Sequence, residues 1–368
     1  MAITVQSPGR INVIGEHTDY NDGFVLPAAI DKVTTFVLEK NGSPNQCTVT
    51  AENMNQTHSF DLQQLKPLAS GWQNYVMGVV NEVQKAGVAV KGFNASFNGN
   101  VPLGAGMSSS AALEASLAYA LNELFGGNLN RKQLARICQL ADHNFVGIKS
   151  GIMDQFASLM GKKDRVLLLD CRSLEFEYFP LELGNYELLL LNSNVSHELA
   201  NSEYNTRRAE CEEGVAILKT YFPEIGSLRD IEIEQLKSHT ANLPKTVYQR
   251  CHHVVSEDVR TLAATQAMQK GQLKTVGELM YQSHRSLQYD YAVTCAETDY
   301  LVDLTVDKPY IIGSRQMGGG FGGCTINLIE KGMADEFTTL AAKAYLAKFE
   351  KEPTRYVVEI GDGTKVVG

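Results

Sequence analysis

Residues 101–112 read Val-Pro-Leu-Gly-Ala-Gly-Met-Ser-Ser-Ser-Ala-Ala, and helix-forming sequence follows directly from Leu113 onward. Gly104 and Gly106 have no Cβ, so the backbone can turn tightly and approach a ligand. The serines that follow can begin a helix whose first N–H groups face an anion. This stretch therefore predicts a phosphate-binding loop at a helix N-terminus, and an ordinary glycine turn with a serine N-cap is the alternative.

The length and composition are those of a globular enzyme with two domains. The chain has 368 residues and a mass of 40.4 kDa, which is more than one hydrophobic core usually serves. No stretch is apolar for long enough to span a bilayer, and the N-terminus has no basic region followed by an apolar core. We therefore expect a cytoplasmic protein with no membrane partner, and a monomer, although the sequence leaves oligomers open.

The charge argues against a nucleic-acid-binding protein, and the cysteine content argues against a disulfide-linked one. The formal net charge is −9 and no basic stripe is interleaved with aromatic residues, so nucleic acid is not expected as a partner. The seven cysteines are scattered and odd in number, as is typical of reduced thiols. The run Cys251-His252-His253 lacks the spacing of a zinc site, so no metal is assigned there.

The order of the predicted elements indicates an α+β fold. The predicted helices lie near 108–125, 131–146, 201–221, 246–270, 273–287 and 332–349. The predicted strands lie at 34–38, 47–51, 93–97, 166–170, 188–191, 310–314 and 325–329. From the change of pattern near residue 180, we place one α+β domain at residues 1–180 and a second at residues 181–368, with a cleft between them.

Residues 9–20 read Gly-Arg-Ile-Asn-Val-Ile-Gly-Glu-His-Thr-Asp-Tyr and come directly after a short apolar strand. They combine an arginine, two carboxylates, an imidazole and two hydroxyls. Carboxylates and imidazole accept hydrogen bonds from O–H groups in defined directions. The segment therefore predicts a site for a hydroxyl-rich ligand such as a sugar, and a solvated polar turn is the alternative.

Asp154 lies among apolar residues in the segment Ser150-Gly-Ile-Met-Asp-Gln-Phe156. A buried carboxylate stays ionised only with a cationic or hydrogen-bonding partner. Arg10 is the candidate for that partner if the two segments meet in the fold. Taken alone, Asp154 is explained equally well as a helix N-cap or as a catalytic base.

Residues 317–325 form a third motif, Met-Gly-Gly-Gly-Phe-Gly-Gly-Cys-Thr. Its glycines satisfy the dinucleotide pattern Gly-x-Gly-x-x-Gly, but that pattern has to open a helix, whereas Thr325-Ile326 indicates a strand. No glycine run ends in Gly-Lys-Ser/Thr, so a Walker loop is absent as well. If phosphate binds, backbone amides and the helix dipole must replace the usual lysine.

Together these motifs resemble one family, the GHMP kinases of sugars and other small molecules, which include galactokinase, homoserine kinase, mevalonate kinase and phosphomevalonate kinase. Residues 9–27 look like the galactokinase signature, residues 102–112 resemble the ATP-binding motif, and residues 318–325 resemble the third glycine-rich motif. The matches span nearly the whole chain. The resemblance implies the two-domain GHMP kinase fold, with the active site in the cleft between the domains.

The resemblance also implies a sugar pocket. Its substrate-binding residues would be Glu16, His17, Thr18, Asp19, Gly151, Asp154 and Tyr204. Among them, Glu16, His17 and Asp19 would bind galactose hydroxyls. Gly151 and Asp154 would close around the anomeric end, and Tyr204 looks like the tyrosine that completes the pocket.

The nucleotide and metal sites are implied in the same way. The residues that would hold ATP are Gly104, Ala105, Gly106, Met107, Ser108, Ser109 and Ser110, with Trp72 at the border of the adenine. A single aromatic residue on a helix is more often part of the core, which is the alternative for Trp72. Ser110 and Asp142 would ligate Mg²⁺. Galactokinases commonly have a glutamate twelve residues before the catalytic aspartate, whereas this chain has the shorter Asp142, which can bind through a water or from a closer helix.

The implied reaction transfers the γ-phosphoryl group of Mg-ATP to the C1 hydroxyl of α-D-galactose, giving galactose 1-phosphate and ADP, the first step of galactose catabolism. Asp154 would accept or orient the hydroxyl proton, and Arg10 would hold Asp154 and offset charge on the transferred group. The alternatives are a kinase for N-acetylgalactosamine, homoserine or mevalonate, and a catalytically silent sensor of galactose and ATP. The intact run 108–112 argues against the sensor.

Overall fold

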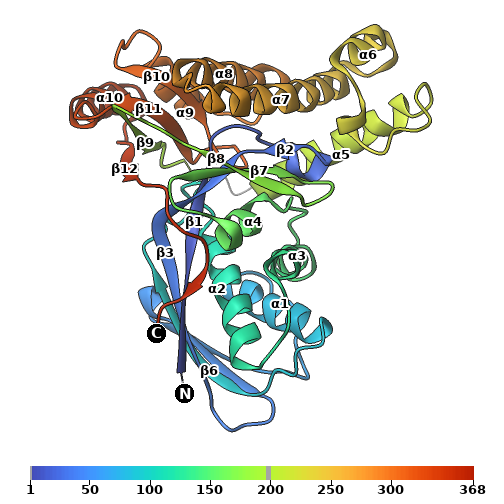
Figure 1. Cartoon of the computed structure of the whole chain (residues 1–368), viewed down its shortest axis with the longest axis vertical. Coiled ribbons are helices and arrows are strands. Elements are labelled where there is room, and N and C mark those ends of the chain that lie inside the picture. The colour runs from blue at the N-terminus through green and yellow to red at the C-terminus, as the bar shows by residue number, and fades with distance from the viewer. Residues whose placement is uncertain (1, 196–199) are drawn as a thin grey trace.

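A narrow lower part and a broad upper part make up the molecule, and the long strands β1 (Ala2–Asn12) and β3 (Pro27–Lys40) run from one to the other (Figure 1). The computed structural model describes residues 2–195 and 200–368. The last residues return from the upper part and pair β13 (Lys365–Val366) with β1, so both chain ends lie in the lower part (Figure 1). The predicted α+β class is confirmed, and the division at residue 180 stays a prediction.

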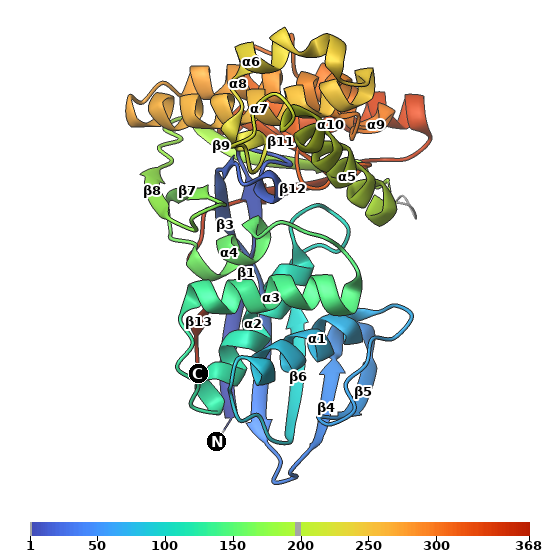
Figure 2. The ribbon, with the colours of Figure 1, turned by 90° about the vertical axis from the view of Figure 1, so that its right-hand side faces the viewer.

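The lower part is a six-stranded sheet with helices on one face (Figure 2). The strand order is β13-β1-β3-β6-β4-β5, with β4 (Gln46–Ala51) and β6 (Phe93–Gly99) parallel to each other and the remaining neighbours antiparallel. The other elements of this part are β5 (Gln56–Asp61), α1 (Trp72–Lys85), α2 (Ser109–Leu124), α3 (Arg131–Ala141) and the short turn η2 (Glu52–Met54). The short turn η1 (Asp19–Asn21) follows the upper end of β1 and contacts the upper part through Tyr20 and Tyr291. Apolar residues at alternate strand positions, such as Phe36 and Leu38, pack against these helices.

The upper part is a four-stranded sheet covered on both faces. Its order is β10-β11-β9-β12, from Ile311–Gln316, Cys324–Glu330, Tyr186–Asn192 and Thr354–Val358. Its helices are α5 (Ala200–Leu218), α6 (Ile233–Ser238), α7 (Lys245–Gln269), α8 (Leu273–Ser286), α9 (Ala296–Asp303) and α10 (Ala334–Phe349), with η4 (Leu228–Asp230), η5 (Thr240–Asn242) and η6 (Leu287–Tyr291) between them. In β9, Leu188 and Leu190 pack with α8, whereas Leu189 and Leu191 pack with α10. Burial on both faces explains why β9 reads as an unbroken apolar run.

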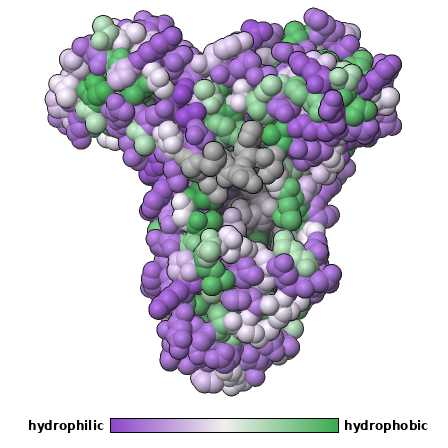
Figure 3. Space-filling view, turned by 180° about the vertical axis from the view of Figure 1, so that it is seen from behind, coloured by the Kyte–Doolittle hydropathy of each residue, from purple (hydrophilic) through white to green (hydrophobic). Residues whose placement is uncertain are grey.

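The junction between the two parts contains a smaller sheet and a short helix. Strands β2 (Phe24–Val25), β7 (Arg165–Asp170) and β8 (Phe176–Pro180) form the sheet, beside α4 (Met153–Met160). Seen from behind, the surface is mostly hydrophilic, and hydrophobic side chains gather along the middle where the two parts meet (Figure 3). Among the described residues, no helix has the length and apolar character that crossing a bilayer requires.

The predicted helices and strands are all present, and one of them is interrupted in an informative way. The helix expected at 131–146 ends as an α-helix at Ala141 and continues as a π-helical turn, η3 (Asp142–Val146). A π-turn changes the direction in which side chains project and is frequent at functional sites. It begins at Asp142, which the sequence singled out as a metal ligand.

Two glycines let α8 approach β10 closely. A Cβ on Gly277 would overlap the backbone carbonyl oxygen of Ile312, and a Cβ on Gly313 would overlap Gly277. Since both neighbours are backbone atoms, neither can turn aside. Close packing here brings β10 and the loop after it toward the junction.

We expect Gly277→Ala to lower the free energy of unfolding by about 1 to 3 kcal/mol, because overpacking outweighs the gain of about 1 kcal/mol in helix propensity. The measurement is the midpoint of urea unfolding followed by circular dichroism. The matched control is Gln282→Ala at an exposed position of the same helix, which should shift stability by less than about 0.5 kcal/mol. An unchanged midpoint for Gly277→Ala would contradict a rigid contact between α8 and β10.

Candidate active site

A polar cavity of about 160 Å³ lies between the lower and upper parts. The residues predicted from sequence that line it are Arg10, Glu16, His17, Asp19, Ser110, Asp142, Gly151, Asp154 and Tyr204. They come from β1, the loop after it, η1, α2, η3, the loop before α4, α4 and α5. Segments that are far apart in the sequence therefore supply one site.

A paired arginine and aspartate form the floor of this cavity. Arg10, on β1, donates from Nε to Asp154 Oδ1 at 2.7 Å and from Nη2 to Asp154 Oδ2 at 2.8 Å. Arg10 Nη1 also donates to the carbonyl of Gly106, and the Ser108 hydroxyl donates to Asp154 Oδ2. Asp154 lies in the first turn of α4, whose N-cap is Ile152, so the alternative of an N-cap role for Asp154 is wrong. The carboxylate is held at two oxygens and keeps about a third of its surface exposed.

The glycine- and serine-rich loop packs directly on β1. The amide of Arg10 donates to the carbonyl of Met107 at 3.1 Å, and a Cβ on Gly9 would come too close to the same oxygen. Ser108 has a left-handed backbone with φ of 56°, and α2 begins at Ser109. The predicted arrangement of a tight loop opening a helix is therefore present, and the hydroxyl of Ser108, at the start of that helix, contacts Asp154.

Asp19 and Gly151 are matched to each other. A Cβ on Gly151 would overlap the Asp19 carboxylate, so only glycine leaves room for that side chain. Burial, and then the neighbouring carboxylates of Asp154 and Glu16, raise the pKa of Asp19 to about 7. Asp19 is thus a carboxyl group that gains and loses its proton near neutral pH.

His17 has one ring nitrogen with a partner and one without. Its backbone is left-handed, with φ of 63°, and the Asn21 amide donates to its carbonyl at 2.9 Å. Nδ1 lies 2.7 Å from the hydroxyl of Tyr20, whereas Nε2 is buried with no hydrogen-bond partner among the described residues. Burial, and then the charges of His253 and Arg207, hold the pKa of His17 well below its usual value. The ring is neutral at pH 7, and His17 is one of the residues that line the cavity.

The other predicted sugar residues differ in their exposure to the cavity. The ring of Tyr204 lies against those of His17 and Tyr20, with centroids 5.5 and 5.2 Å away. Thr18 was expected among the substrate-binding residues, but the structure does not place it on the cavity wall. Its buried hydroxyl lies 2.6 Å from the carbonyl of Phe24 and 3.0 Å from that of Gly15, where it closes the turn.

Asp142 and Ser110 lie on the same cavity as Asp154. Asp142 Oδ2 accepts from Gln155 at 2.8 Å and from Ser150 at 3.0 Å, and burial raises its pKa to about 7. No group of three or more histidine, cysteine or acidic side chains in the described part of the chain could hold a metal by itself. One carboxylate and one hydroxyl nevertheless fit Mg²⁺, which commonly completes its shell with water and substrate phosphates.

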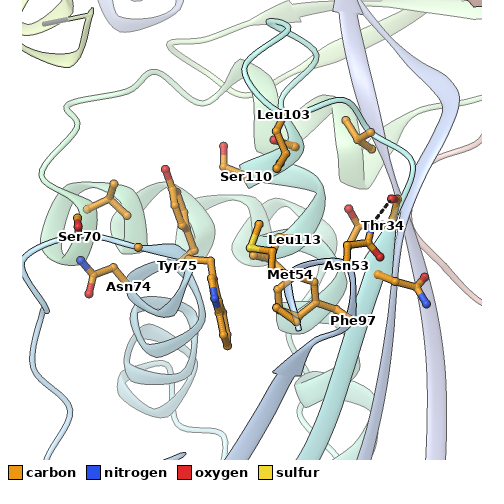
Figure 4. Close-up of a pocket in the computed structure, with 18 of the residues that line it drawn as sticks. Thr34, Asn53, Met54, Ser70, Asn74, Tyr75, Phe97, Leu103, Ser110 and Leu113 are labelled. Atoms are coloured by element: carbon orange, nitrogen blue, oxygen red, sulfur yellow. Dashed lines mark hydrogen bonds between the residues drawn. The ribbon is translucent and has the colours of Figure 1, made fainter. Parts of the chain in front are cut away.

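A larger pocket of about 550 Å³ adjoins the polar cavity and shares Tyr75 and Ser110 with it. Figure 4 shows the side chains of Tyr75 and Phe97 on opposite sides of this pocket, and Ser110 at the end formed by α2. Trp72 lines the pocket and is also part of the core, so its expected place at the border of the adenine stays a prediction. Its indole nitrogen donates to Gln56 at 2.8 Å and its ring meets Phe97 edge-on.

Sequence reasoning missed three charged residues that hold the N-terminal motif in place. Arg315, on β10, is fully buried and donates to the carbonyls of Asn12 and Val13 and to Glu16 Oε1, the last at 2.9 Å. The other two, Glu257 and Asp258, lie on α7. Glu257 accepts from the amides of Gly15 and Glu16, and Asp258 accepts from the amide of Phe24 at 2.7 Å. The signal that could have identified these three residues is a charged side chain within the apolar pattern of a predicted helix or strand.

Comparisons with known proteins agree with this geometry. Family models match the GHMP kinases N terminal domain at residues 74–162, the galactokinase galactose-binding signature at residues 2–40 and the GHMP kinases C terminal at residues 264–347. The fold and site are therefore those of a GHMP kinase, an ATP-dependent phosphotransferase.

Comparison with individual relatives narrows the assignment from the GHMP kinases as a whole to one family among them. The chain is 42% identical to galactokinase of Thermotoga neapolitana and 41% identical to that of Thermosipho africanus, over 99% and 98% of this chain and 99% of each relative. The crystal structure of Lactococcus lactis galactokinase complexed with galactose matches with a TM-score of 0.96 and 34% identity, over 100% of this chain and 95% of that one. The Methanococcus jannaschii mevalonate kinase, at 16% identity and a TM-score of 0.66, shares the fold. The chain belongs to the galactokinase family, as the sequence motifs predicted.

The raised pKa of Asp19 has a measurable effect on stability. The folded protein retains this proton up to about pH 7, whereas the unfolded chain loses it near pH 4, so stability falls as the pH rises between these values. We expect Asp19→Asn to be more stable relative to wild type at pH 8 than at pH 5, by roughly 2 kcal/mol. Urea unfolding at the two pH values measures the difference.

The control for this comparison is Asp303→Asn, at an exposed position of α9, which should show no such dependence on pH. A difference between Asp19→Asn and wild type that is the same at pH 5 and pH 8 would contradict the raised pKa.

Proposed function

We propose that the chain transfers the γ-phosphoryl group of ATP to the C1 hydroxyl of galactose, giving galactose 1-phosphate and ADP. The observation that carries the proposal is the Arg10–Asp154 pair, which lies where the polar cavity meets the glycine- and serine-rich loop. A kinase has to bring an acceptor hydroxyl and a phosphoryl group to one point. In this structure a small polar cavity and the glycine- and serine-rich loop share that point.

The polar cavity suits a sugar. Glu16, Asp19 and Asp154 present carboxylate oxygens to it, and each can accept from a sugar hydroxyl. The rings of Tyr204 and His17 supply apolar surface between these acceptors. The galactose in the Lactococcus lactis galactokinase structure supports galactose as the substrate.

The larger pocket and the loop suit ATP. The loop at 104–110 would hold the phosphates with backbone amides at the start of α2. The pocket between Tyr75 and Phe97 would then take the base, bordered by Trp72. Ser110 lines both cavities, so it lies where phosphates leaving the base pocket would reach the acceptor.

Ser110 and Asp142 would hold Mg²⁺, with phosphate oxygens and waters completing the shell. The ion neutralises charge on the phosphates when bound. Gln155 and Ser150 donate to Oδ2 of Asp142 and so fix the orientation of this carboxyl group.

Asp154 is placed to orient the C1 hydroxyl and to receive its proton. Arg10 and Ser108 occupy both carboxylate oxygens, which keeps the group in one orientation, and the exposed third of its surface faces the cavity. Because phosphoryl transfer passes through a loose transition state, orientation contributes early and proton removal late. Arg10 also places positive charge next to the transferred group.

We infer a cytoplasmic location and a monomer acting on galactose and ATP, without nucleic acid or membrane as partners. All seven cysteines are free thiols, which suits a reducing compartment.

Release of ADP from Mg-ATP in the presence of galactose, N-acetylgalactosamine, glucose, mevalonate or homoserine tests the proposed substrate. We expect turnover that is selective for galactose and that drops by about 100-fold or more in Asp154→Ala. Selective turnover of another acceptor would move the activity within the family. Tight binding of galactose and ATP with no ADP release would instead favour the sensor.

Arg10→Lys tests the role of the arginine. Lysine keeps the charge but loses the planar pair of N–H donors, so we expect kcat for galactose to fall by about 100-fold. The control is Arg285→Lys, at an exposed position of α8, which should leave kcat unchanged. An Arg10→Lys enzyme with wild-type turnover would remove Arg10 from the mechanism.

A further inference from the structure

A line of hydrogen-bonding groups leads from the cavity into the upper part of the molecule. It begins at His17, whose Nδ1 lies 2.7 Å from the hydroxyl of Tyr20. The Tyr20 hydroxyl lies 2.7 Å from that of Tyr291, and the Tyr291 hydroxyl lies 3.2 Å from the sulfur of Cys211. Tyr291 ends η6 and Cys211 lies on α5, and both side chains are fully buried.

Each hydroxyl has one proton to donate, so a line in which every member donates to the next runs in one of two directions. In one direction, Cys211 donates to Tyr291, Tyr291 to Tyr20, and Tyr20 to His17 Nδ1. His17 then carries its proton on Nε2. In the other direction, His17 Nδ1 donates to Tyr20, and Nε2 is left without a proton. The line thus determines what Nε2 offers to the cavity.

The rest of the cavity favours an Nε2 that donates. Glu16, Asp19 and Asp154 present acceptor oxygens, and three nitrogens of Arg10 already donate to Asp154 and Gly106. Each hydroxyl of a sugar donates one hydrogen bond and can accept two. A sugar in this cavity therefore meets several acceptors and also needs donors for its own oxygens. His17 lines the cavity, and its buried Nε2 has no hydrogen-bond partner in the described structure.

We propose that Tyr20 and Tyr291 hold His17 in the tautomer with its proton on Nε2, so that His17 donates a hydrogen bond to an oxygen of the bound sugar. Tyr20 and Tyr291 are positioning residues, since they act through His17. The inference deepens the proposed function and rests on it, because the ligand is the galactose assigned to this cavity.

The tautomer is measured directly by ¹⁵N NMR of histidine-labelled protein, in which protonated and bare ring nitrogens resonate apart. The chain has eight histidines, and His17→Gln identifies the signals of His17 by their loss. We expect wild type to carry the proton on Nε2, both free and with galactose bound. Finding it on Nδ1 in the galactose complex would overturn the proposal.

Tyr20→Phe keeps the ring that packs on His17 and Tyr204 but removes the hydroxyl at Nδ1. We expect the galactose KM and Kd to rise about 5- to 20-fold, the KM for ATP and kcat to change less than about 2-fold, and the His17 signals to move toward a mixture of tautomers. Tyr291→Phe should change the same quantities in the same direction by a smaller factor. An unchanged galactose affinity in Tyr20→Phe would overturn the proposal.

Tyr345→Phe is the matched control. It removes the hydroxyl of another buried tyrosine, which lies on α10. That hydroxyl donates to the Ser193 carbonyl at 2.7 Å. The substitution should lower stability without moving the galactose KM or the His17 signals.

A separate measurement on the wild-type protein shows whether the proposed function itself fails. A wild-type protein that neither binds nor phosphorylates galactose contradicts the assigned ligand, while the ¹⁵N spectrum of the free protein still decides the tautomer.

Discussion

The site depends on the hydrogen bonds and the ion pair that the fully buried guanidinium of Arg315 makes. It donates to two backbone carbonyls at the end of β1 and to the Glu16 carboxylate, and the amide of Gly318 donates to the same carboxylate oxygen at 2.8 Å. A buried ion pair is stable only when its remaining donors and acceptors are satisfied, and here the backbone of both parts satisfies them. The contact therefore joins the N-terminal motif to the third glycine-rich motif and sets the position of the cavity between them.

The acidic character of the cavity follows from that arrangement. Glu16, Asp19, Asp142 and Asp154 lie around a small space that contains the single guanidinium of Arg10. Burial and mutual repulsion raise the pKa values of Asp19 and Asp142 to about 7. A ligand that brings hydroxyl donors or a cation would relieve this excess of negative charge, as the proposed sugar and Mg²⁺ would. Without a ligand the clustered carboxylates repel one another, and a bound cation or hydroxyl donor would reduce that repulsion.

Close backbone approach is the second condition for the site. The glycine at position 151 leaves room for Asp19, and Gly277 with Gly313 lets α8 pack on β10. In both places a Cβ would meet an atom that belongs to another segment of the chain. The glycines at these positions therefore act through distant neighbours, and turn propensity does not explain them.

The sequence by itself determined the α+β class, the helices and strands, and the tight loop at 104–110 that opens a helix. These follow from local periodicity and from turn chemistry, whereas the residues proposed to hold sugar, nucleotide and metal come from the resemblance of the motifs to a family. Only the tertiary structure decided that Arg10 pairs with Asp154, that Thr18 closes a turn, and that Arg315, Glu257 and Tyr291 support the N-terminal motif. Each of these contacts joins residues more than a hundred positions apart, apart from Thr18, whose two acceptors lie within six residues. A pattern in sequence records what a residue can do, whereas burial and hydrogen-bond partners decide which of its groups remain free to act.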